Sequence, residues 1–310
     1  MFLSVPKATA CLAAFLLAAC SGPREGDVSG PGAGSVPFDG IDLAAYLDCA
    51  REQGVTLLQA HRAGDRPGAA ENSLSAINQS LADGAVFAEI DVARTADGVL
   101  VLMHDDTLDR TTTGSGTLAG TDFAKLLTLT LVDVDGEDTG ETVPTFADAL
   151  GALEGRGFAQ IDRKQSTSFD EIATIIEDEQ AADRSIVITY TIEEAIAVHR
   201  RLPEVMVSTG INDLEAIARL RSASVDLSRV TAWLGLGPGR PGLDRELAAL
   251  GIETSYGDFR AESDGSVDYK RLSSNGAEVL SVDDVAAAAG ALEAAVVARA
   301  LLSDCPAAQR

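Results

Sequence analysis

The octapeptide VFAEIDVA (residues 86–93) decides how the fold of this chain is read. It is an apolar run of the kind that forms a buried strand, yet two carboxylates stand at alternate positions within it. Because side chains two residues apart in a strand point to the same face, Glu89 and Asp91 project together. Buried carboxylates cost free energy unless they are paired or bound to a cation. We therefore expect this strand to open into a functional site.

Other apolar runs accompany this one and alternate with helical stretches, which is typical of a parallel sheet built from βα units. Residues 39–310 show no detectable repeat and no break in composition, so we expect one domain there. We predict the α/β class and a single (β/α)8 TIM barrel, with a short helix before the first strand and active residues at the C-terminal ends of strands. The predicted strands are Thr56–His61, Val86–Ala93, Val99–His104, Phe158–Lys164, Ser185–Tyr190, Val205–Thr209, Val230–Leu234, Ile252–Tyr256 and Val279–Val282. The predicted helices are Asn72–Ala82, Asp122–Leu127, Thr145–Leu153, Ser168–Asp178, Ile192–Arg201 and Leu214–Leu220, and the glycine-rich stretches 237–242 and 257–265 are predicted turns.

The charge balance is strongly acidic, with 24 basic residues against 48 acidic ones in 310 residues. Nucleic-acid binding depends on basic patches that release counterions, and the sequence contains no such cluster, so we exclude nucleic acid as a partner. A hydrophobic content of 46% is ample for a large core. An acidic protein that acts on a phosphate needs a metal ion or a local basic pocket.

The first residues have the composition of a targeting segment. Lys7 precedes the apolar run Ala8–Ala19, which is too short to span a bilayer but fits a signal peptide over residues 1–19. The sequence Leu17–Cys20 resembles a bacterial lipobox, in which the cysteine is lipidated, and residues 20–38 would be a flexible tether. We expect a lipid-anchored lipoprotein of the bacterial cell envelope that faces the periplasm or the exterior. An ordinary secretory signal with an incidental cysteine is the alternative.

Cysteine usage agrees with export. With Cys11 in the signal and Cys20 lipidated, the two remaining cysteines are Cys49 and Cys305. An oxidising compartment favours pairing and a barrel brings its two ends together, so we predict a disulfide between them. Two buried free thiols are the alternative.

The polar residues at strand ends suggest a hydrolytic site. Of three histidines in the chain, His61 and His104 each end an apolar run. Glu89, Asp91 and Asp162 could together bind a hard divalent cation, Mg²⁺ or Ca²⁺, since such ions prefer oxygen ligands. Salt bridges from these acids to nearby basic residues are the alternative interpretation, with candidates at Arg62, Arg94, Arg163 and Lys164.

The order and spacing of these motifs resemble those of the glycerophosphodiester phosphodiesterase family. The match is specific as far as about residue 165 and thin beyond it. The family's motifs stand here as His61-Arg62-Ala63-Gly64, Ala70-Glu71-Asn72-Ser73, Glu89-Ile90-Asp91, Asp97-Gly98, His104-Asp105, Leu108-Asp109-Arg110-Thr111-Thr112, Val143-Pro144-Thr145-Phe146 and Ile161-Asp162-Arg163-Lys164.

The resemblance implies a barrel hydrolase that cleaves glycerophosphodiesters to sn-glycerol 3-phosphate and an alcohol. Carried over by position, it assigns the divalent cation to Glu89, Asp91 and Asp162. It assigns general acid–base catalysis to His61 and His104. It assigns contacts to the phosphate or the rest of the substrate to Arg62, Glu71 and Lys164.

The chain departs from the family pattern in two places. Asp162 replaces a glutamate, which shortens one ligand by a methylene, so the ion could shift or recruit a water. The later half lacks the family's usual strand motifs. This implies that the side of the pocket that holds the leaving group is rebuilt. Trp233 and Tyr256 could line the pocket there or simply pack in the core. Two alternatives follow: a related phosphodiesterase acting on lysophospholipids or phosphoinositides, and an inactive lipoprotein that binds a phosphorylated ligand.

Overall fold

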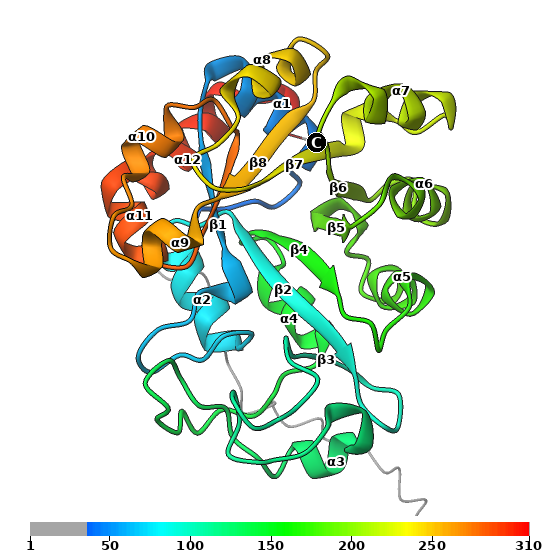
Figure 1. Cartoon of the computed structure of the whole chain (residues 1–310), viewed down its shortest axis with the longest axis vertical. Helices are drawn as coiled ribbons and strands as arrows, with labels where there is room; N and C mark the ends of the chain where they lie inside the picture. The colour runs from blue at the N-terminus through cyan, green and yellow to red at the C-terminus, as the bar shows by residue number, and fades with distance from the viewer. Residues whose placement is uncertain (1–35, 310) are drawn as a thin grey trace, which may run out of the picture. The chain divides into compact units, whose positions relative to one another are not determined.

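Eight parallel strands close into a barrel in the computed structural model, which describes residues 36–309 (Figure 1). Each strand pairs with its neighbours, and β1 pairs with both β9 and β2, so the sheet closes on itself. Helices lie between the strands and pack around the barrel, so the prediction of a (β/α)8 barrel is confirmed. The barrel strands are β1 Leu57–Ala60, β2 Phe87–Arg94, β4 Phe158–Arg163, β5 Ser185–Thr189, β6 Met206–Gly210, β7 Val230–Leu236, β8 Glu253–Gly257 and β9 Val279–Val282.

One predicted strand lies outside the barrel. β3 (Leu100–Leu102) runs antiparallel to the far end of β2, after a tight turn that includes Gly98 at φ 89°. A turn this short can only reverse the chain, because a parallel partner requires a long crossover. The hairpin brings the chain back to the barrel mouth, where the Met103 amide donates to the Asp91 carbonyl at 2.9 Å. His104 is thereby placed at the mouth although it follows no barrel strand.

The helices surround the barrel as predicted through α7, but sequence periodicity missed those that follow. The stretch 237–242, predicted as a turn, contains the start of α8, and the stretch 257–265 contains α9. α11 is almost uniformly apolar (VAAAAGAL), so it lacks the polar alternation that marks an amphipathic helix. The helices are α1 Leu43–Gln53, α2 Leu74–Asp83, α3 Phe123–Leu126, α4 Phe146–Leu153, α5 Phe169–Asp178, α6 Ile192–Arg201, α7 Leu214–Ser222, α8 Pro241–Ala248, α9 Phe259–Ser263, α10 Tyr269–Ser273, α11 Val285–Leu292 and α12 Ala294–Asp304.

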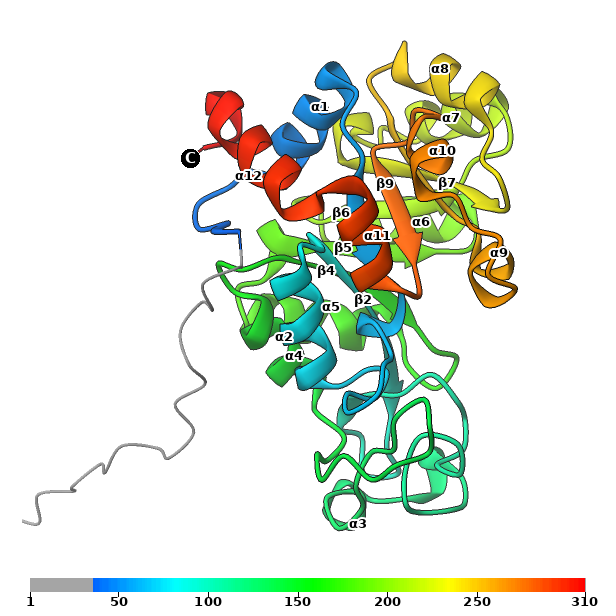
Figure 2. The same ribbon diagram turned by 90° about the vertical axis from the view of Figure 1, so that its left-hand side faces the viewer.

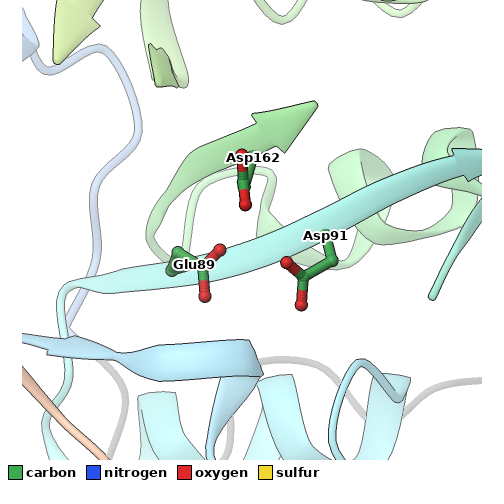
Figure 3. Close-up of side chains that lie close together, drawn as sticks. All are labelled: Glu89, Asp91 and Asp162. Carbon is green, nitrogen blue, oxygen red and sulfur yellow. The ribbon is translucent and has the colours of Figure 1, made fainter. Parts of the chain in front are cut away.

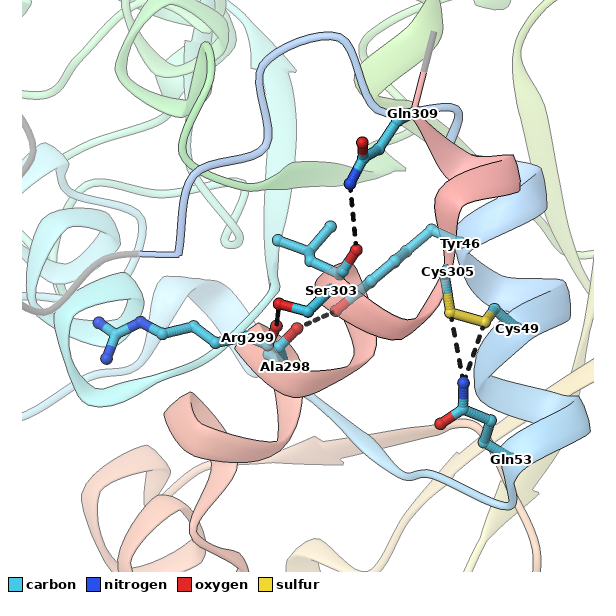
Figure 4. The surroundings of a disulfide bond; sticks show 9 residues. Tyr46, Cys49, Gln53, Ala298, Arg299, Ser303, Cys305 and Gln309 are labelled. Carbon is cyan, nitrogen blue, oxygen red and sulfur yellow. Dashed lines mark hydrogen bonds between the residues drawn. A yellow bond between two sulfur atoms is a disulfide. The ribbon is translucent and has the colours of Figure 1, made fainter.

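Two terminal helices, α1 and α12, lie side by side (Figure 2). A disulfide joins Cys49 of α1 to Cys305, with their Cα atoms 6.2 Å apart (Figure 4). Nearby, the Tyr46 hydroxyl donates to the Ala298 carbonyl at 3.2 Å. The structure thus contains the predicted cysteine pair, and it ties the first helix of the domain to the last.

The domain begins earlier than predicted. Val36 and Phe38 are only 2% and 5% exposed, although both fall within the predicted tether, residues 20–38. Phe38 packs edge-on against Tyr46, with ring centroids 5.4 Å apart, so an apolar contact fixes this part of the chain. The predicted signal peptide and Cys20 lie outside the described residues.

Within residues 36–309, no single helix is long and apolar enough to cross a membrane. Only α11 and α12, taken as a pair bent by 59°, meet that test of length and composition.

Candidate active site

Three carboxylates meet on two neighbouring strands (Figure 3). Glu89 and Asp91 come from β2, and Asp162 on β4 is the register partner of Asp91. Their exposed fractions are 4%, 2% and 7%, and one oxygen from each lies within 4.8 Å of the others. The alternation of side chains along the strands thus predicted this acidic cluster correctly. Asp162 reaches it although its side chain is one methylene shorter than the glutamate of the family pattern.

One lysine partly balances the charge of the acidic cluster. Lys164 Nζ lies 2.5 Å from Asp91 Oδ1 and 2.7 Å from Asp162 Oδ2. Burial acts to lower the pKa of Lys164, but the two carboxylates outweigh it and raise that pKa, so the ammonium stays charged. Burial, followed by the charge of Asp91, raises the pKa of Glu89 well above its usual range.

Of the other basic candidates, only Arg62 pairs with the acidic cluster, through a long contact to Asp91. Arg94 is paired with Glu171 at 3.7 Å, and Arg163 with Glu194 at 3.4 Å. Arg62 Nε stays 4.0 Å from Asp91 Oδ2. Salt bridges therefore account for only part of the buried negative charge among the described residues. The donor set of three buried carboxylates fits a hard divalent cation.

Asn72 fixes the position of Asp91, and sequence analysis missed it. The Asn72 side-chain Nδ2 donates to Asp91 Oδ2 at 2.7 Å, and the Asn72 side-chain Oδ1 accepts from the Asp91 backbone amide at 2.9 Å. Asn72 adopts φ 57°, a left-handed conformation that asparagine tolerates better than most residues. The signal was present in the motif that contains Glu71 and Asn72, but nothing local tells which strand the amide contacts.

Arg62 and Glu71 belong to a network beside the acidic cluster. The Arg62 amide donates to Glu89 Oε2 at 2.7 Å, while its guanidinium bonds Glu71 at 3.2 Å. Glu71 also accepts two hydrogen bonds from Arg110, at 2.8 and 2.7 Å. Glu71 is therefore held by two arginines and is not one of the three carboxylates of the acidic cluster.

Each of the two predicted catalytic histidines has an aspartate partner. His61 Nδ1 lies 2.7 Å from Asp283 Oδ1, in the loop after β9. The His61 ring also stacks on Phe259 of α9, with centroids 4.3 Å apart. His104 Nδ1 lies 2.7 Å from Asp105 Oδ1. A carboxylate at Nδ1 favours the tautomer that carries its proton there, which leaves Nε2 for another partner.

Arg110 connects the His104 pair to the network around Glu71. Its Nε lies 2.7 Å from Asp105 Oδ2, and its Nη2 lies 3.0 Å from Asp105 Oδ1. The Arg110 hydrogen bond holds the pKa of Asp105 well below its usual range, so that carboxylate stays ionised beside His104. Arg110 thus braces the loop that carries Asp105.

A pocket of about 350 Å³ opens beside the acidic cluster. It is lined by His61, Glu89 and Asp162, and also by Trp233 of β7 and by Tyr190, which follows β5. The Tyr190 hydroxyl donates to Asp162 Oδ1 at 2.7 Å, a contact that no sequence motif indicated.

Tyr256 and the third histidine, His199, do not line this pocket. Tyr256 is buried and its hydroxyl donates to the Leu272 carbonyl at 2.6 Å, so it packs rather than lining the pocket. His199 lies on the partly exposed helix α6, where Nε2 accepts from the Asp226 amide at 3.3 Å.

Two relatives of the chain are named as glycerophosphodiester phosphodiesterases. A glycerophosphodiester phosphodiesterase 1 from Rattus norvegicus is 43% identical over 94 residues, which are 29% of this chain and 28% of that protein. A glycerophosphodiester phosphodiesterase from Caldanaerobacter subterraneus is 36% identical over 104 residues, 33% of this chain and 42% of that protein. The matched stretch thus spans less than half the length of either relative.

Solved structures share the fold. A glycerophosphoryl diester phosphodiesterase from Parabacteroides distasonis superposes with a TM-score of 0.76 at 23% identity, covering 84% of this chain and 93% of that one. A phosphodiesterase from Oleispira antarctica, solved in complex with the product sn-glycerol 3-phosphate, has a TM-score of 0.60 at 19% identity, covering 78% and 99%.

The sequence model of one family matches from His61 to Asp226, which is more than half of the chain. That span begins at His61, which lines the pocket, and it contains the acidic cluster and the pair His104–Asp105. By this match the chain belongs to the glycerophosphoryl diester phosphodiesterase family.

Proposed function

We propose that this protein hydrolyses glycerophosphodiesters to sn-glycerol 3-phosphate and an alcohol, with a divalent cation and two histidines. The observation that carries the proposal is a buried acidic cluster that shares one pocket with His61, while His104 lines a neighbouring hollow together with Lys164, and each histidine is bound to an aspartate. The retention of both predicted catalytic histidines, His61 and His104, argues against the alternative of an inactive binding lipoprotein.

Glu89, Asp91 and Asp162 would hold the cation, Mg²⁺ or Ca²⁺. When bound, such an ion supplies positive charge that stabilises the phosphoryl oxygens. Lys164 already reaches two of these carboxylates, and Arg62 lies beside them, so both cations are available to bind the remaining phosphate oxygens. An acidic protein thus obtains a local site for an anionic substrate.

The two histidines would move the protons. Imidazole titrates near neutral pH, so one ring can take a proton from the glycerol hydroxyl that attacks the phosphorus while the other gives one to the oxygen of the leaving alcohol. Water would then open the resulting cyclic phosphate to glycerol 3-phosphate, with the two proton transfers reversed. Asp283 and Asp105 hold the rings by Nδ1, so each presents Nε2 for this transfer.

The test is an assay on the full mature protein. With Mg²⁺ or Ca²⁺ it should release glycerol 3-phosphate from glycerophosphocholine or glycerophosphoethanolamine and lose this activity in chelator. His61→Ala and His104→Ala should each lower kcat by about 10²-fold or more. His199→Ala is the matched control, since it removes the third histidine from helix α6. Absence of turnover on a panel of phosphodiesters with every divalent ion tried contradicts the proposal.

Metal binding has a readout of its own. Calorimetric titration of the chelator-treated protein should show one divalent ion bound per chain, and Asp91→Asn should weaken that binding. If the wild type binds no ion while it still hydrolyses diesters, the acidic cluster has another purpose.

We also propose that the mature protein is anchored to the bacterial envelope through a lipid on Cys20. The lipobox-like sequence Leu17–Cys20 supports this. Mass spectrometry of the N-terminal peptide should find diacylglycerol on Cys20, and Cys20→Ala should release the protein from the membrane fraction. An unmodified Cys20 in the membrane fraction contradicts the anchor.

A further inference from the structure

Asp162 differs from the other two carboxylates of the acidic cluster in its reach and its strand. It is one methylene shorter than the glutamate of the family pattern, and it comes from β4, whereas the other two share β2. Two side chains contact it: Lys164 Nζ lies 2.7 Å from Oδ2, and the Tyr190 hydroxyl donates to Oδ1 at 2.7 Å. Because each carboxylate oxygen has two lone pairs, both oxygens can accept these bonds and still bind a cation.

The other two carboxylates are also held by donors that carry no net charge. The Arg62 backbone amide donates to Glu89 Oε2 at 2.7 Å. The Asn72 side-chain amide donates to Asp91 Oδ2 at 2.7 Å. Tyr190 completes this pattern on the third carboxylate, so each member of the acidic cluster is oriented by a neutral donor. Such hydrogen bonds fix the orientation of ligands around a metal ion.

The two contacts of Asp162 differ in charge. Lys164 is an ammonium, so it repels a divalent cation bound at the same carboxylate, and it is also the group proposed to bind the phosphate. The phenol of Tyr190 is neutral, so its hydrogen bond orients Asp162 without opposing the cation. Tyr190 can therefore hold this carboxylate in place while the ion and the substrate are bound.

The backbone at Tyr190 is fixed to the strand that carries Asp162. Tyr190 lies between β5 and α6, and its amide donates to Glu194 Oε2 at 2.8 Å. The other carboxylate oxygen of Glu194 pairs with Arg163 at 3.4 Å. Arg163 is the residue after Asp162 on β4, and it donates to the Thr167 carbonyl at 2.7 Å. This chain of contacts sets the place from which the phenol reaches the carboxylate.

The Tyr190 side chain contributes little to the core. The residue is 67% exposed, although its hydroxyl reaches the buried Asp162. Removal of the hydroxyl alone therefore opens no cavity in the core. An effect on the site can thus be separated from an effect on the fold.

We propose that Tyr190 is a positioning residue for the cation, because its hydroxyl holds the short Asp162 in the orientation that completes the acidic cluster. This inference rests on the proposed function, since it requires that the acidic cluster bind a divalent ion. It assigns to a hydroxyl from the segment after β5 the support that a longer carboxylate on β4 would not need.

The experiment is a calorimetric titration of Mg²⁺ and Ca²⁺ into the chelator-treated full mature protein. Tyr190→Phe should raise the Kd about tenfold, as expected when a group that orients a metal ligand is lost. Asp162→Glu should make binding independent of the hydroxyl, so that Tyr190→Phe in that background raises the Kd by about twofold or less. Tyr46→Phe is the matched control: the Tyr46 hydroxyl donates to the Ala298 carbonyl between the terminal helices, so the Kd should not change.

Two further measurements separate positioning from other roles of Tyr190. High concentrations of the ion should restore kcat of Tyr190→Phe for glycerophosphodiester hydrolysis, whereas a lost contact with the substrate would stay lost. Thermal unfolding of the ion-free protein should change less in Tyr190→Phe than in Tyr46→Phe, because Tyr46 is fully buried.

An unchanged Kd in Tyr190→Phe overturns the inference and leaves the proposed hydrolysis standing. An equal rise in Kd in the wild-type and Asp162→Glu backgrounds also overturns it, because the hydroxyl then acts through another group. A kcat that stays low at saturating ion does the same. If the wild type binds no divalent ion, the proposed metal site fails and this inference fails with it.

Discussion

At the scale of single residues, the two aspartates that contact the histidines give the most specific prediction about the site. Asp283 Oδ1 lies 2.7 Å from His61 Nδ1, and its side chain is half exposed. The backbone of Asp283 is fixed from behind, where its amide donates to Glu262 at 3.0 Å. Asp283 is therefore well placed to orient the imidazole of His61 while lying outside the acidic cluster.

Asp283→Asn should lower kcat by roughly 10- to 10²-fold with little change in KM, because the amide can stabilise the wrong tautomer of His61. Steady-state kinetics with a pH–rate profile is the measurement. Asp284→Asn is the control, since Asp284 is the next residue and its carboxylate caps α11 through the Ala287 amide. Equal losses in both variants, or a rise in KM alone, point to a structural effect and contradict the positioning.

The residues of the site differ in how far the sequence could reveal them. The alternation of side chains along a strand predicted that Glu89 and Asp91 share one face. The family's histidine motifs identified His61 and His104. The partners of these residues could not be found in the same way. Asp283 lies 222 residues from His61 in the sequence. The Tyr190 hydroxyl bonds Asp162, but nothing in the sequence distinguishes Tyr190 from the other tyrosines. Such contacts depend on barrel closure, which periodicity does not encode.

At the scale of elements, the C-terminal end of α2 is packed tightly against the start of α12. Gly84 ends α2 at φ 115°, and a Cβ placed there would meet the Ala295 amide nitrogen at 2.6 Å. Both a positive φ and a close backbone approach therefore require glycine at this position.

Gly84→Ala should destabilise the protein by about 2–4 kcal/mol, from left-handed strain of about 1 kcal/mol plus the overpacking against α12. Gly136→Ala isolates the first cause, because Gly136 has φ 79° but a methyl group at its Cα would meet no atom within 4 Å. Denaturant unfolding of both variants measures the difference. Equal losses at the two positions contradict the close packing of α2 on α12.

Elements were predictable where amphipathic contrast is strong and unpredictable where it is absent. α5 (FDEIATIIED) has a capping box from Ser168 and Glu171 and a clear apolar face, and its predicted bounds nearly coincide with the observed ones. α11 and α12 are rich in alanine and valine, so their faces differ little in sequence. β3 was predicted as a strand, but its direction depends on the short turn at Gly98 and not on its own residues.

At the scale of the whole molecule, acidic groups are buried at both ends of the barrel. Glu278 and Glu253 stand at the N-terminal ends of β9 and β8, far along the strands from the active-site residues, and are 3% and 1% exposed. The Thr254 amide donates to Glu278 at 2.7 Å, and Arg51 Nε lies 2.8 Å from Glu253. Burial raises the pKa of Glu278 to about 8 and that of Glu253 to about 7.

These raised pKa values predict how stability depends on pH. A carboxyl whose pKa is raised by folding holds its proton in the folded state and loses it in the unfolded state once the pH exceeds its ordinary value of 4.5. The folded state then binds more protons, so stability falls as pH rises from about 4.5 to about 8 and changes little above that.

Glu278→Gln should remove the part of this dependence that Glu278 causes, because glutamine has no proton to lose and keeps a carbonyl for the Thr254 amide. The variant should match the wild type near pH 4.5 and exceed it above pH 8 by a few kcal/mol, since each tenfold change in proton affinity contributes about 1.4 kcal/mol. Thermal unfolding across this range measures the gap, with Glu246→Gln on the exposed face of α8 as control. A gap that stays constant with pH, or one that Glu246→Gln reproduces, contradicts a buried neutral Glu278.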